Sequence, residues 1–463
     1  MKYYSTRNKS LSYDFRSIFE RGLAPDGGLF IPKELKRFSE EELSKLGKLS
    51  YLNLATEIIH CFCKENFSKD NVSKIVKKSY SKFQYKDVVE IKKFEDLALV
   101  ELYHGPTLAF KDIAMQVIGN LYSELKIAED KVINIIVATS GDTGSAAISA
   151  LNDKKNINVF VLHPHNKISP TQRKIMTTIG SKNIYNIALK GNFDDCQKAV
   201  KAMFSDNDFR EKINMSGVNS INWARIICQI VYYFYCYFKL SKKTNFAVPT
   251  GNFGDIYAGY IAKKMGLPMG KLIVATNEND ILARVINSGK YEPSKVKSTL
   301  TPSMDIQISS NFERLLFDIA NNSDVRVKNL MNELKIKGSF LLEKNELDEM
   351  KSFFEAESID DTDTIRIIRD FFNNFGFILD PHTATAVGAS YKIQNNLPTV
   401  ILATAHPYKF AETVKIAINK DISTPKQILS LPNKIEKFDV MENNLKDLKK
   451  YVIDKIYENK TWR

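Results

Sequence analysis

The sequence has few cysteines and no long apolar run. Its five cysteines are an odd number, Cys61 and Cys63 form only a C-x-C pair, and no second pair follows at the spacing that a zinc site needs. The most apolar stretch, residues 226–238, is shorter than the ~20 residues that span a bilayer, and the N-terminal residues lack the apolar centre of a signal peptide. We therefore expect no metal, no disulfide framework and no membrane segment, but reduced thiols in the cytoplasm.

Motifs of several common enzyme classes are also absent. The sequence contains neither G-x-x-x-x-G-K-[ST] nor G-x-G-x-x-G, which excludes a P-loop nucleoside triphosphatase and the dinucleotide fingerprint. It has no G-x-S-x-G of an α/β hydrolase and no H-E-x-x-H of a zinc protease. His163 and His165 form H-x-H, but no third ligand accompanies them, and Pro164 is typical of a strand end.

The charge balance of the chain is basic. The 463 residues include 66 Lys and Arg against 54 Asp and Glu, a net charge of +12, and the 44% hydrophobic content excludes extended disorder. A basic surplus raises the alternative of a nucleic-acid binder. The lysines, however, are spread along helix-like stretches such as Lys74, Lys77, Lys78 and Lys82, without interleaved stacking aromatics. We therefore favour a solvated basic surface that suits small anionic ligands, and we expect no nucleic-acid partner.

The pattern of apolar residues changes along the chain. Residues 1–85 are expected to form a small, mainly helical N-terminal domain, with a turn at 24–28 and helical spacing over 40–48 and 51–63. Short apolar strands then alternate with amphipathic helices, which predicts an α/β fold with parallel sheet and helices on both faces. The predicted strands are 133–138, 159–162, 184–189, 246–248, 272–275 and 400–403.

Two later segments depart from this alternation. Residues 291–363 are irregular and charged, with Pro293, Pro302 and a helix-like stretch at 311–321, so we expect an insertion or a mobile segment. Residues 434–463 are charged and amphipathic, which predicts a terminal helical extension.

The junction after the predicted strand 133–138 has the composition of an anion site. The strand leads into a loop of small and hydroxylated residues, after which a helix is expected to begin. The loop residues are Thr139, Ser140, Gly141, Asp142, Thr143 and Gly144. Such a junction presents backbone N–H groups, hydroxyls and a positive helix end at the carboxyl edge of a sheet. It predicts a carboxylate or phosphate site, and a capped glycine-rich turn is the alternative.

A second junction of the same kind follows the predicted strand 246–248. Residues 249–255 read PTGNFGD and precede a helix-like stretch at 256–265. Two such loops in one α/β chain predict a ligand with two anionic ends.

Two further segments carry side chains suited to catalysis. Lys111 follows Phe110 just inside a predicted helix start, where desolvation can lower the pKa of an amine that forms a Schiff base or moves a proton. Taken alone, such a lysine is more often a surface residue. Thr404 ends the predicted strand 400–403 and would place a hydroxyl at the carboxyl edge of the sheet, with strand termination before Pro407 as the alternative.

Taken together, these segments resemble a known family. They are similar to threonine synthase, in its long bacterial and fungal form, over nearly the whole chain and in the expected order. The matching segments are GLAPDGGLFIP (22–32), HGPTLAFKD (104–112), ATSGDTGSAA (138–147), NSINWARI (219–226), PTGNFGD (249–255), SSNFERLLF (309–317), DPHTA (380–384) and ATAHPYKF (403–410).

The resemblance implies a pyridoxal 5'-phosphate (PLP) enzyme of fold type II, similar to the tryptophan synthase β subunit. Its catalytic region, residues 86–430, would form two α/β lobes of open parallel or mixed sheets, and residues 431–463 would form a C-terminal helical extension. The implied reaction converts O-phospho-L-homoserine and water into L-threonine and phosphate by γ-elimination and β-addition. PLP would lie between the lobes at the carboxyl edge of the sheet.

The resemblance also implies the residues that hold PLP. Lys111 would hold the cofactor covalently and move the substrate's Cα and Cβ protons. Thr404 would hydrogen-bond the pyridine nitrogen, and Asp142 would lie near the ring hydroxyl. The cofactor phosphate would be bound by the backbone of Gly251, Asn252, Phe253 and Gly254.

The same resemblance implies contacts to the substrate. The substrate carboxylate would bind at Thr139, Ser140, Gly141 and Thr143. Arg314 is our candidate for the substrate phosphate, with Ser309, Ser310 and Asn311 as neighbours and a helix-surface arginine as the alternative. Arg225 has the same ambiguity, and a structural role at the edge of the core is slightly favoured.

Other functions fit some of the same residues. A PLP-dependent phospho-lyase would release 2-oxobutyrate from the same substrate, and a catalytically silent PLP-fold binding protein would lack turnover. Intact Lys111 and both anion loops argue against the silent protein. Tyr408 stands where the family commonly has alanine, and we expect it to change only the local packing. We expect a monomer, with a dimer as the alternative, and closure of the lobes on the substrate.

Overall fold

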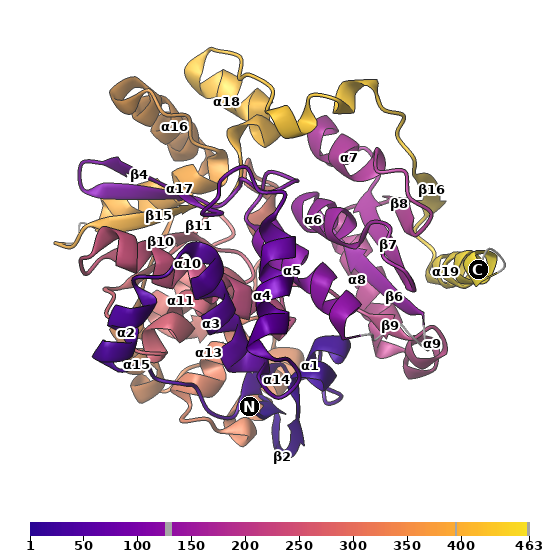
Figure 1. Ribbon diagram of the computed structural model, residues 1–463, viewed down its shortest axis with the longest axis horizontal. Coiled ribbons are helices and arrows are strands. Elements are labelled where there is room, and N and C mark those ends of the chain that lie inside the picture. The colour runs from indigo at the N-terminus through magenta and orange to yellow at the C-terminus, as the bar shows by residue number, and fades with distance from the viewer. Residues whose placement is uncertain (126–131, 394–395, 461–463) are drawn as a thin grey trace.

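The larger of the two sheets that contain parallel strands forms one lobe of the protein. The computed structural model describes residues 1–125, 132–393 and 396–460. Its larger sheet has six strands in the order β14-β11-β10-β15-β5-β4, all parallel to their neighbours except the antiparallel pair β4 and β5 (Figure 1). The strands are β4 (Glu90–Phe94), β5 (Leu97–Glu101), β10 (Asn245–Pro249), β11 (Leu272–Thr276), β14 (Phe354–Ser358) and β15 (Thr399–Ala403).

The smaller sheet forms the second lobe, at the right of Figure 1. It has five parallel strands in the order β16-β8-β7-β6-β9. Every residue of β7 is buried, because helices cover both faces and a strand covered on both faces needs apolar side chains on both. The two lobes confirm the predicted α/β fold. The strands are β6 (Ile133–Ala138), β7 (Ile157–Pro164), β8 (Ile184–Lys190), β9 (Met215–Ser216) and β16 (Asp439–Glu442).

Four helices join the lobes and begin at the sheet edges. α5 (Lys111–Glu124) packs on α6 (Asp142–Leu151) of the smaller lobe, and α10 (Trp223–Leu240) packs on α11 (Gly254–Lys264) of the larger lobe. α5 and α10 also pack on each other. α10 contains the most apolar run of the sequence and is buried along residues 223–236, so this run is a core helix. None of the described helices is both long and apolar enough to cross a membrane.

The N-terminal region contains a sheet beside its helices. The short strands β1 (Tyr3–Ser5), β2 (Asn8–Tyr13) and β3 (Phe30–Pro32) pair antiparallel in the order β2-β1-β3, which the sequence analysis did not predict. The Tyr3 ring lies 6.4 Å from that of Trp223, so this region shares its core with α10. Its helices are α1 (Phe15–Arg21), α2 (Glu40–Leu46), α3 (Tyr51–Cys63) and α4 (Lys69–Tyr80).

The irregular segment 291–363 is an ordered part of the larger lobe. The expectation of an insertion or a mobile segment is wrong for its end, because β14 pairs with β11 over five residues and completes the six-stranded sheet. Between them lie α12 (Ile281–Ser288), α13 (Phe312–Ile319), α14 (Asp324–Lys337) and α15 (Lys344–Phe353). The remaining longer helices are α7 (Pro170–Thr177), α8 (Phe193–Ser205), α9 (Asn207–Lys212), α16 (Asp361–Phe375), α17 (Pro381–Ile393) and α18 (Ala411–Ile418).

The C-terminal region adds one strand to the smaller sheet. β16 pairs parallel with β8, which the sequence analysis did not predict, and α19 (Leu445–Lys460) packs on α8. Residues 461–463 of the predicted extension lie outside the described residues. The domain boundaries after residues 85 and 430 stay predictions.

Candidate active site

Two segments far apart in the sequence meet at the carboxyl edge of the larger sheet. β5 and β15 are parallel neighbours, and the chain that leaves each of them pairs again beyond the sheet. The backbone N–H of Phe110 donates to the carbonyl of Thr404 (2.8 Å), and that of His406 donates to Leu108 (3.0 Å). Lys111 begins α5 directly after this contact, so the fold brings Lys111 and Thr404 to one edge.

Lys111 is buried and faces a carboxylate. Its side chain is 11% exposed, and its Nζ lies 3.3 Å from Oδ2 of Asp142 and 5.4 Å from the centre of the Phe110 ring. Burial lowers the pKa of the Lys111 amine, Asp142 opposes this, and the positive charges of Arg225 and Lys409 add to it. The surface alternative for Lys111 is therefore wrong, and the amine has the environment of a nucleophile or a proton carrier.

Asp142 is shared by two lysines. It is the first residue of α6 and is buried, and Nζ of Lys409 lies 2.5 Å from its Oδ1. Burial alone would raise the pKa of Asp142, but Lys111 and then Lys409 hold it well below its usual value. Gln172 Nε2 (3.1 Å) and Ser303 Oγ (3.3 Å) also donate to this carboxylate. Asp142 is therefore a fixed anion beside Lys111.

Lys409 is a site residue that the sequence analysis missed. Its side chain is fully buried, and besides Asp142 its Nζ donates to the carbonyl of Thr107 (2.9 Å). The signal was present, because Lys409 belongs to the segment ATAHPYKF. Gln172 and Ser303 were also missed, and neither has a local pattern that marks it.

The buried hydroxyl of Thr139 fixes the conformation of the first anion loop, residues 139–144. The Thr139 hydroxyl accepts hydrogen bonds from the backbone N–H groups of Gly141 and Gly144, both at 2.9 Å, and the side chain is buried. Thr139 thus takes the Gly144 N–H of the first turn of α6, but no acceptor among the described residues takes the backbone N–H groups of Asp142 and Thr143, so these stay available to an anion. Ser140 and Thr143 are half-buried at its mouth.

The second anion loop presents unused backbone donors. In the described part of the chain, no backbone carbonyl accepts from the N–H groups of Gly251, Asn252, Phe253 and Gly254. Phe253 has a φ of 62°, which turns the chain into α11, and no side chain caps that helix either. A turn of consecutive free N–H groups at a helix start fits a phosphate. The loop is braced from behind, since Asn311 donates to the Asn252 carbonyl through its backbone and its Nδ2 (3.1 and 2.9 Å).

Arg314 does not occupy the position that we expected. Its side chain is fully buried, so the helix-surface alternative is wrong. Its Nε donates to the carbonyl of Phe30 (2.9 Å), its Nη2 donates to that of Ile221 (2.6 Å), and its Nη1 donates to Oδ1 of Asn311. The guanidinium is thus committed to the protein and braces Asn311. We do not retain it as a ligand of the substrate phosphate.

Tyr408 packs between segments of both lobes. It contacts a small apolar cluster of Leu108, Ile175 and Ile428, and its hydroxyl accepts a hydrogen bond from Thr424 (3.1 Å). The larger side chain thus changes packing beside the site while the next residue, Lys409, still reaches Asp142.

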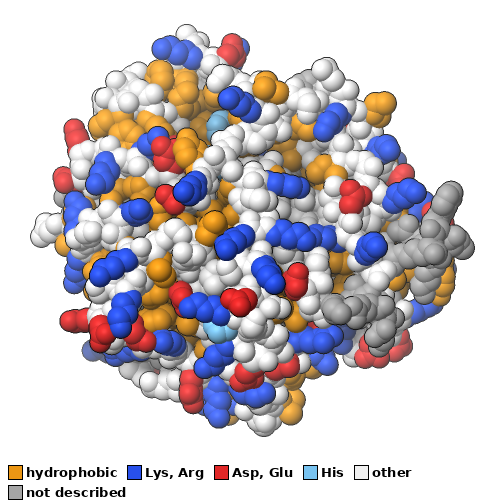
Figure 2. All heavy atoms as spheres, viewed as in Figure 1, with side chains coloured by type: hydrophobic (Ala, Val, Ile, Leu, Met, Phe, Trp, Pro, Cys, Tyr) orange, Lys and Arg blue, Asp and Glu red, His pale blue; other side chains and the backbone are white. Residues whose placement is uncertain are grey.

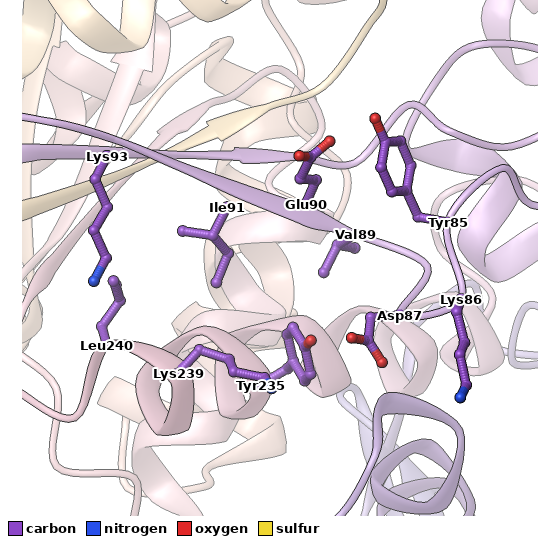
Figure 3. A pocket seen from close by; sticks show the side chains of 10 residues that line it. All are labelled: Tyr85, Lys86, Asp87, Val89, Glu90, Ile91, Lys93, Tyr235, Lys239 and Leu240. Atoms are coloured by element: carbon purple, nitrogen blue, oxygen red, sulfur yellow. The ribbon is translucent and has the colours of Figure 1, made fainter.

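Two other features of the structure lie outside this site. A surface pocket of about 390 Å³ is lined partly by Lys86, Lys93 and Lys239, with Asp87 among them, and includes none of the candidate active-site residues (Figure 3).

Lys and Arg side chains are scattered among acidic and apolar ones on the face shown in Figure 2, without a single basic patch.

One group of side chains has the composition of a metal site. Ligand atoms of Glu90, Glu101 and His104 lie within 4.8 Å of one another. The Tyr103 hydroxyl donates to Glu101 (2.8 Å), the His104 ring bonds the same carboxylate (2.9 Å), and Lys92 pairs with Glu90. These contacts explain the cluster without an ion, and the expectation of no metal stays a prediction.

Comparison with known families agrees with this geometry. Residues 92–400 match the family described as pyridoxal-phosphate dependent enzyme. The fold and the site therefore define a PLP-dependent enzyme of fold type II. Residues 2–80 match the threonine synthase N terminus, and residues 383–452 match the threonine synthase C-terminal family. The chain belongs to the threonine synthase family, a family of PLP-dependent lyases.

Individual relatives span the whole chain. Threonine synthase of Pseudomonas aeruginosa is 41% identical over 459 residues and covers 98% of both chains. That of Saccharomyces cerevisiae is 42% identical and covers 96% of this chain and 94% of its own. The crystal structure of PLP-bound threonine synthase from Brucella melitensis has a TM-score of 0.94 at 41% identity, covering 98% of this chain and 99% of that one. These matches confirm the family, the fold and the cofactor that the motifs implied.

Proposed function

We propose that the protein converts O-phospho-L-homoserine and water into L-threonine and inorganic phosphate. The observation that carries this proposal is the position of Lys111, a buried amine 3.3 Å from Asp142 in a site that also contains the helix N-termini at both anion loops. A substrate with a carboxylate and a cofactor with a phosphate need two such anion sites. PLP, when bound, supplies the electron sink that stabilises negative charge at the substrate's Cα.

Lys111 acts as the covalent anchor of PLP and as the proton carrier. Burial lowers the pKa of this amine, which favours the neutral form that can accept a proton. We assign it removal of the Cα proton, movement of the Cβ proton and return of the Cα proton after phosphate leaves Cγ and water adds at Cβ.

Three other elements would orient the cofactor. The free N–H groups of Gly251, Asn252, Phe253 and Gly254 would hold its phosphate, and Asp142 would face its ring hydroxyl. The hydroxyl of Thr404, a residue that is 6% exposed, would donate a hydrogen bond to the ring nitrogen. A neutral hydroxyl does not hold that nitrogen protonated as a carboxylate would, which moderates electron withdrawal and suits elimination and replacement.

The substrate carboxylate binds at the first anion loop. Ser140, Gly141 and Thr143 surround the N-terminus of α6, whose positive end favours an anion. Thr139 contributes by fixing the loop through its buried hydroxyl.

The proposal extends to the compartment and the oligomeric state of the protein. We propose a cytoplasmic location, since the five cysteines are free thiols and four of them are buried, and we propose a monomer, with a dimer as the alternative. We also propose that the lobes close on the substrate, because Tyr408 and its cluster join segments of both lobes beside the site. Small-angle scattering with and without a substrate analogue tests closure, and an unchanged radius of gyration would contradict it.

Proton and phosphorus NMR in deuterated water tests the reaction. Incubation with O-phospho-L-homoserine should give threonine and phosphate, with deuterium at Cα and Cβ. Lys111→Ala should lose turnover, while Lys77→Ala, an exposed lysine of α4, should keep it. Release of 2-oxobutyrate instead of threonine would establish a phospho-lyase and contradict the proposal.

A further inference from the structure

Among the described residues, Arg225 carries a buried positive charge that has no hydrogen-bond acceptor and no ion-pair partner. It lies in the first turn of α10, is 3% exposed, and its Nε is buried with no hydrogen-bond acceptor. Nor does any carboxylate of the described residues lie within ion-pair distance of its guanidinium. A buried guanidinium normally has several acceptors, as Arg314 has. This arrangement therefore indicates an anion that the protein alone does not supply.

Asp255 supplies negative charge near Arg225 but forms no ion pair with it. Oδ1 of Asp255 accepts from the hydroxyls of Tyr232 (2.6 Å) and Tyr233 (3.0 Å), and its buried Oδ2 has no hydrogen-bond partner among the described residues. Burial raises the pKa of Asp255 to about 6, and burial lowers the pKa of Arg225 only to about 10. Arg225 is therefore a cation at neutral pH.

The position of Arg225 points to the second anion loop. The next residue, Ile226, has its Cδ1 3.7 Å from the place where a Cβ on Gly254 would lie, so the start of α10 borders this loop. α10 packs along α11, whose uncapped N-terminus follows the loop. Arg225 also lies close enough to Lys111 for its positive charge to lower the pKa of that amine.

We propose that Arg225 binds the phosphate group of PLP and completes the cradle formed by the backbone of Gly251–Gly254. This inference rests on the proposed function of that loop. Backbone N–H groups and a helix end supply only partial charges, and a full positive charge in a dry site adds to their attraction for a phosphate dianion. A guanidinium supplies it with two parallel N–H donors.

The test compares PLP with pyridoxal, which lacks the phosphate. Apoenzyme of the wild type and of Arg225→Met is titrated with each, and binding at Lys111 is followed by the visible absorbance of the bound cofactor. We expect Arg225→Met to raise the Kd for PLP by about 10- to 150-fold, the range of one hydrogen-bonded charge, and to leave the Kd for pyridoxal unchanged. Arg225→Lys should lie between the two, because it keeps the charge but not the paired donors.

Arg314→Met is the matched control, since Arg314 is also buried and bonds the residue that braces this loop. It leaves the Phe30 and Ile221 carbonyls unpaired, so the apoenzyme should unfold at a lower temperature and both Kd values should change by the same factor. Arg225→Met, by contrast, removes an unpaired buried charge, so its apoenzyme should be at least as stable as the wild type.

Three outcomes would overturn the assignment. An equal change in both Kd values would make Arg225 a structural residue. An unchanged Kd for PLP with a raised KM for O-phospho-L-homoserine would move the contact to the substrate phosphate. A wild-type apoenzyme that binds neither PLP nor pyridoxal at Lys111 would overturn the proposed site as a whole. This outcome differs from a failure of the Arg225 assignment alone, because it is seen in the wild type without any variant.

Discussion

Lys409 offers a quantitative test of the charge arrangement around Lys111. Replacing it with methionine keeps the apolar stem but removes the cation that lies 2.5 Å from Asp142 and the donor to the Thr107 carbonyl. Removing one partner of a buried ion pair typically costs about 3–5 kcal/mol. Asp142 keeps Lys111, Gln172 and Ser303, so we expect the lower end, about 3 kcal/mol, in the free energy of unfolding of the apoenzyme.

A double-mutant cycle isolates this interaction. Asp142→Asn removes the charge that Lys409 neutralises, so Lys409→Met should cost less in that background than in the wild type. Urea unfolding of the four apoenzymes, followed by circular dichroism, gives the interaction free energy. A cost below about 1 kcal/mol in the wild-type background, or equal costs in both, would refute the reasoning, because a buried carboxylate that has lost a paired cation must be destabilised.

The effect of Lys409→Met should also depend on pH. The folded-state pKa of Asp142 lies well below its ordinary value of 3.8, so the carboxylate stabilises the fold fully above pH 3.8 and loses this contribution as the pH falls through the folded-state pKa. Loss of Lys409 raises the folded-state pKa and reduces the contribution. The difference between variant and wild type should therefore be largest near neutral pH and shrink below about pH 4.

Three further predictions concern single residues. Thr404→Val removes the hydroxyl assigned to the ring nitrogen, and equilibrium dialysis should show about 3- to 10-fold weaker binding of PLP and of pyridoxal alike; unchanged affinity would contradict that role. Burial lowers the pKa of His163 to about 4, so the unfolded state binds one more proton than the folded state between about pH 4 and 6.5. The free energy of unfolding should therefore fall by about 1.4 kcal/mol for each pH unit of acidification. Urea unfolding of His163→Leu at pH 5 and 6 should lack this slope. Arg7→Met breaks a bidentate pair with Glu313 (2.7 and 2.9 Å) and should lower the free energy of unfolding by about 1–3 kcal/mol, whereas no change would show that the N-terminal segment does not depend on this contact.

The central strands were predictable because their physical cause is local. β6, β8 and β15 are short apolar runs bounded by small or polar residues, and helices on both faces require such runs. The edge strands β4, β14 and β16 read EIKKF, FEAES and DVME, and are partly exposed. β14 and β16 pair with strands distant in the chain, which no local pattern reveals, whereas β4 forms a hairpin with the next strand, β5, but has a polar sequence.

The site residues, like the strands, were predictable where local sequence decides their position and unpredictable where a distant segment does. Lys111 and the two loops follow from composition at strand-to-helix junctions, where a few neighbouring residues decide the backbone. The pairing of Asp142 with Lys409 joins α6 of one lobe to the chain after β15 of the other, and only the tertiary fold sets that contact. Arg314 was assigned wrongly for a related reason, since an arginine in a helix pattern gives no sign that carbonyls of two remote segments surround it.

The last strand of the smaller sheet has a consequence for synthesis of the chain. β8 ends at Lys190 and is an outer strand until β16, which begins at Asp439, pairs with it, and 248 residues lie between these two positions. An uncovered strand edge is a template for pairing with other chains. On a ribosome that adds ~5–20 residues per second, this edge stays exposed for about 12–50 seconds, so the nascent smaller lobe depends on chaperones or dilution until its final strand arrives.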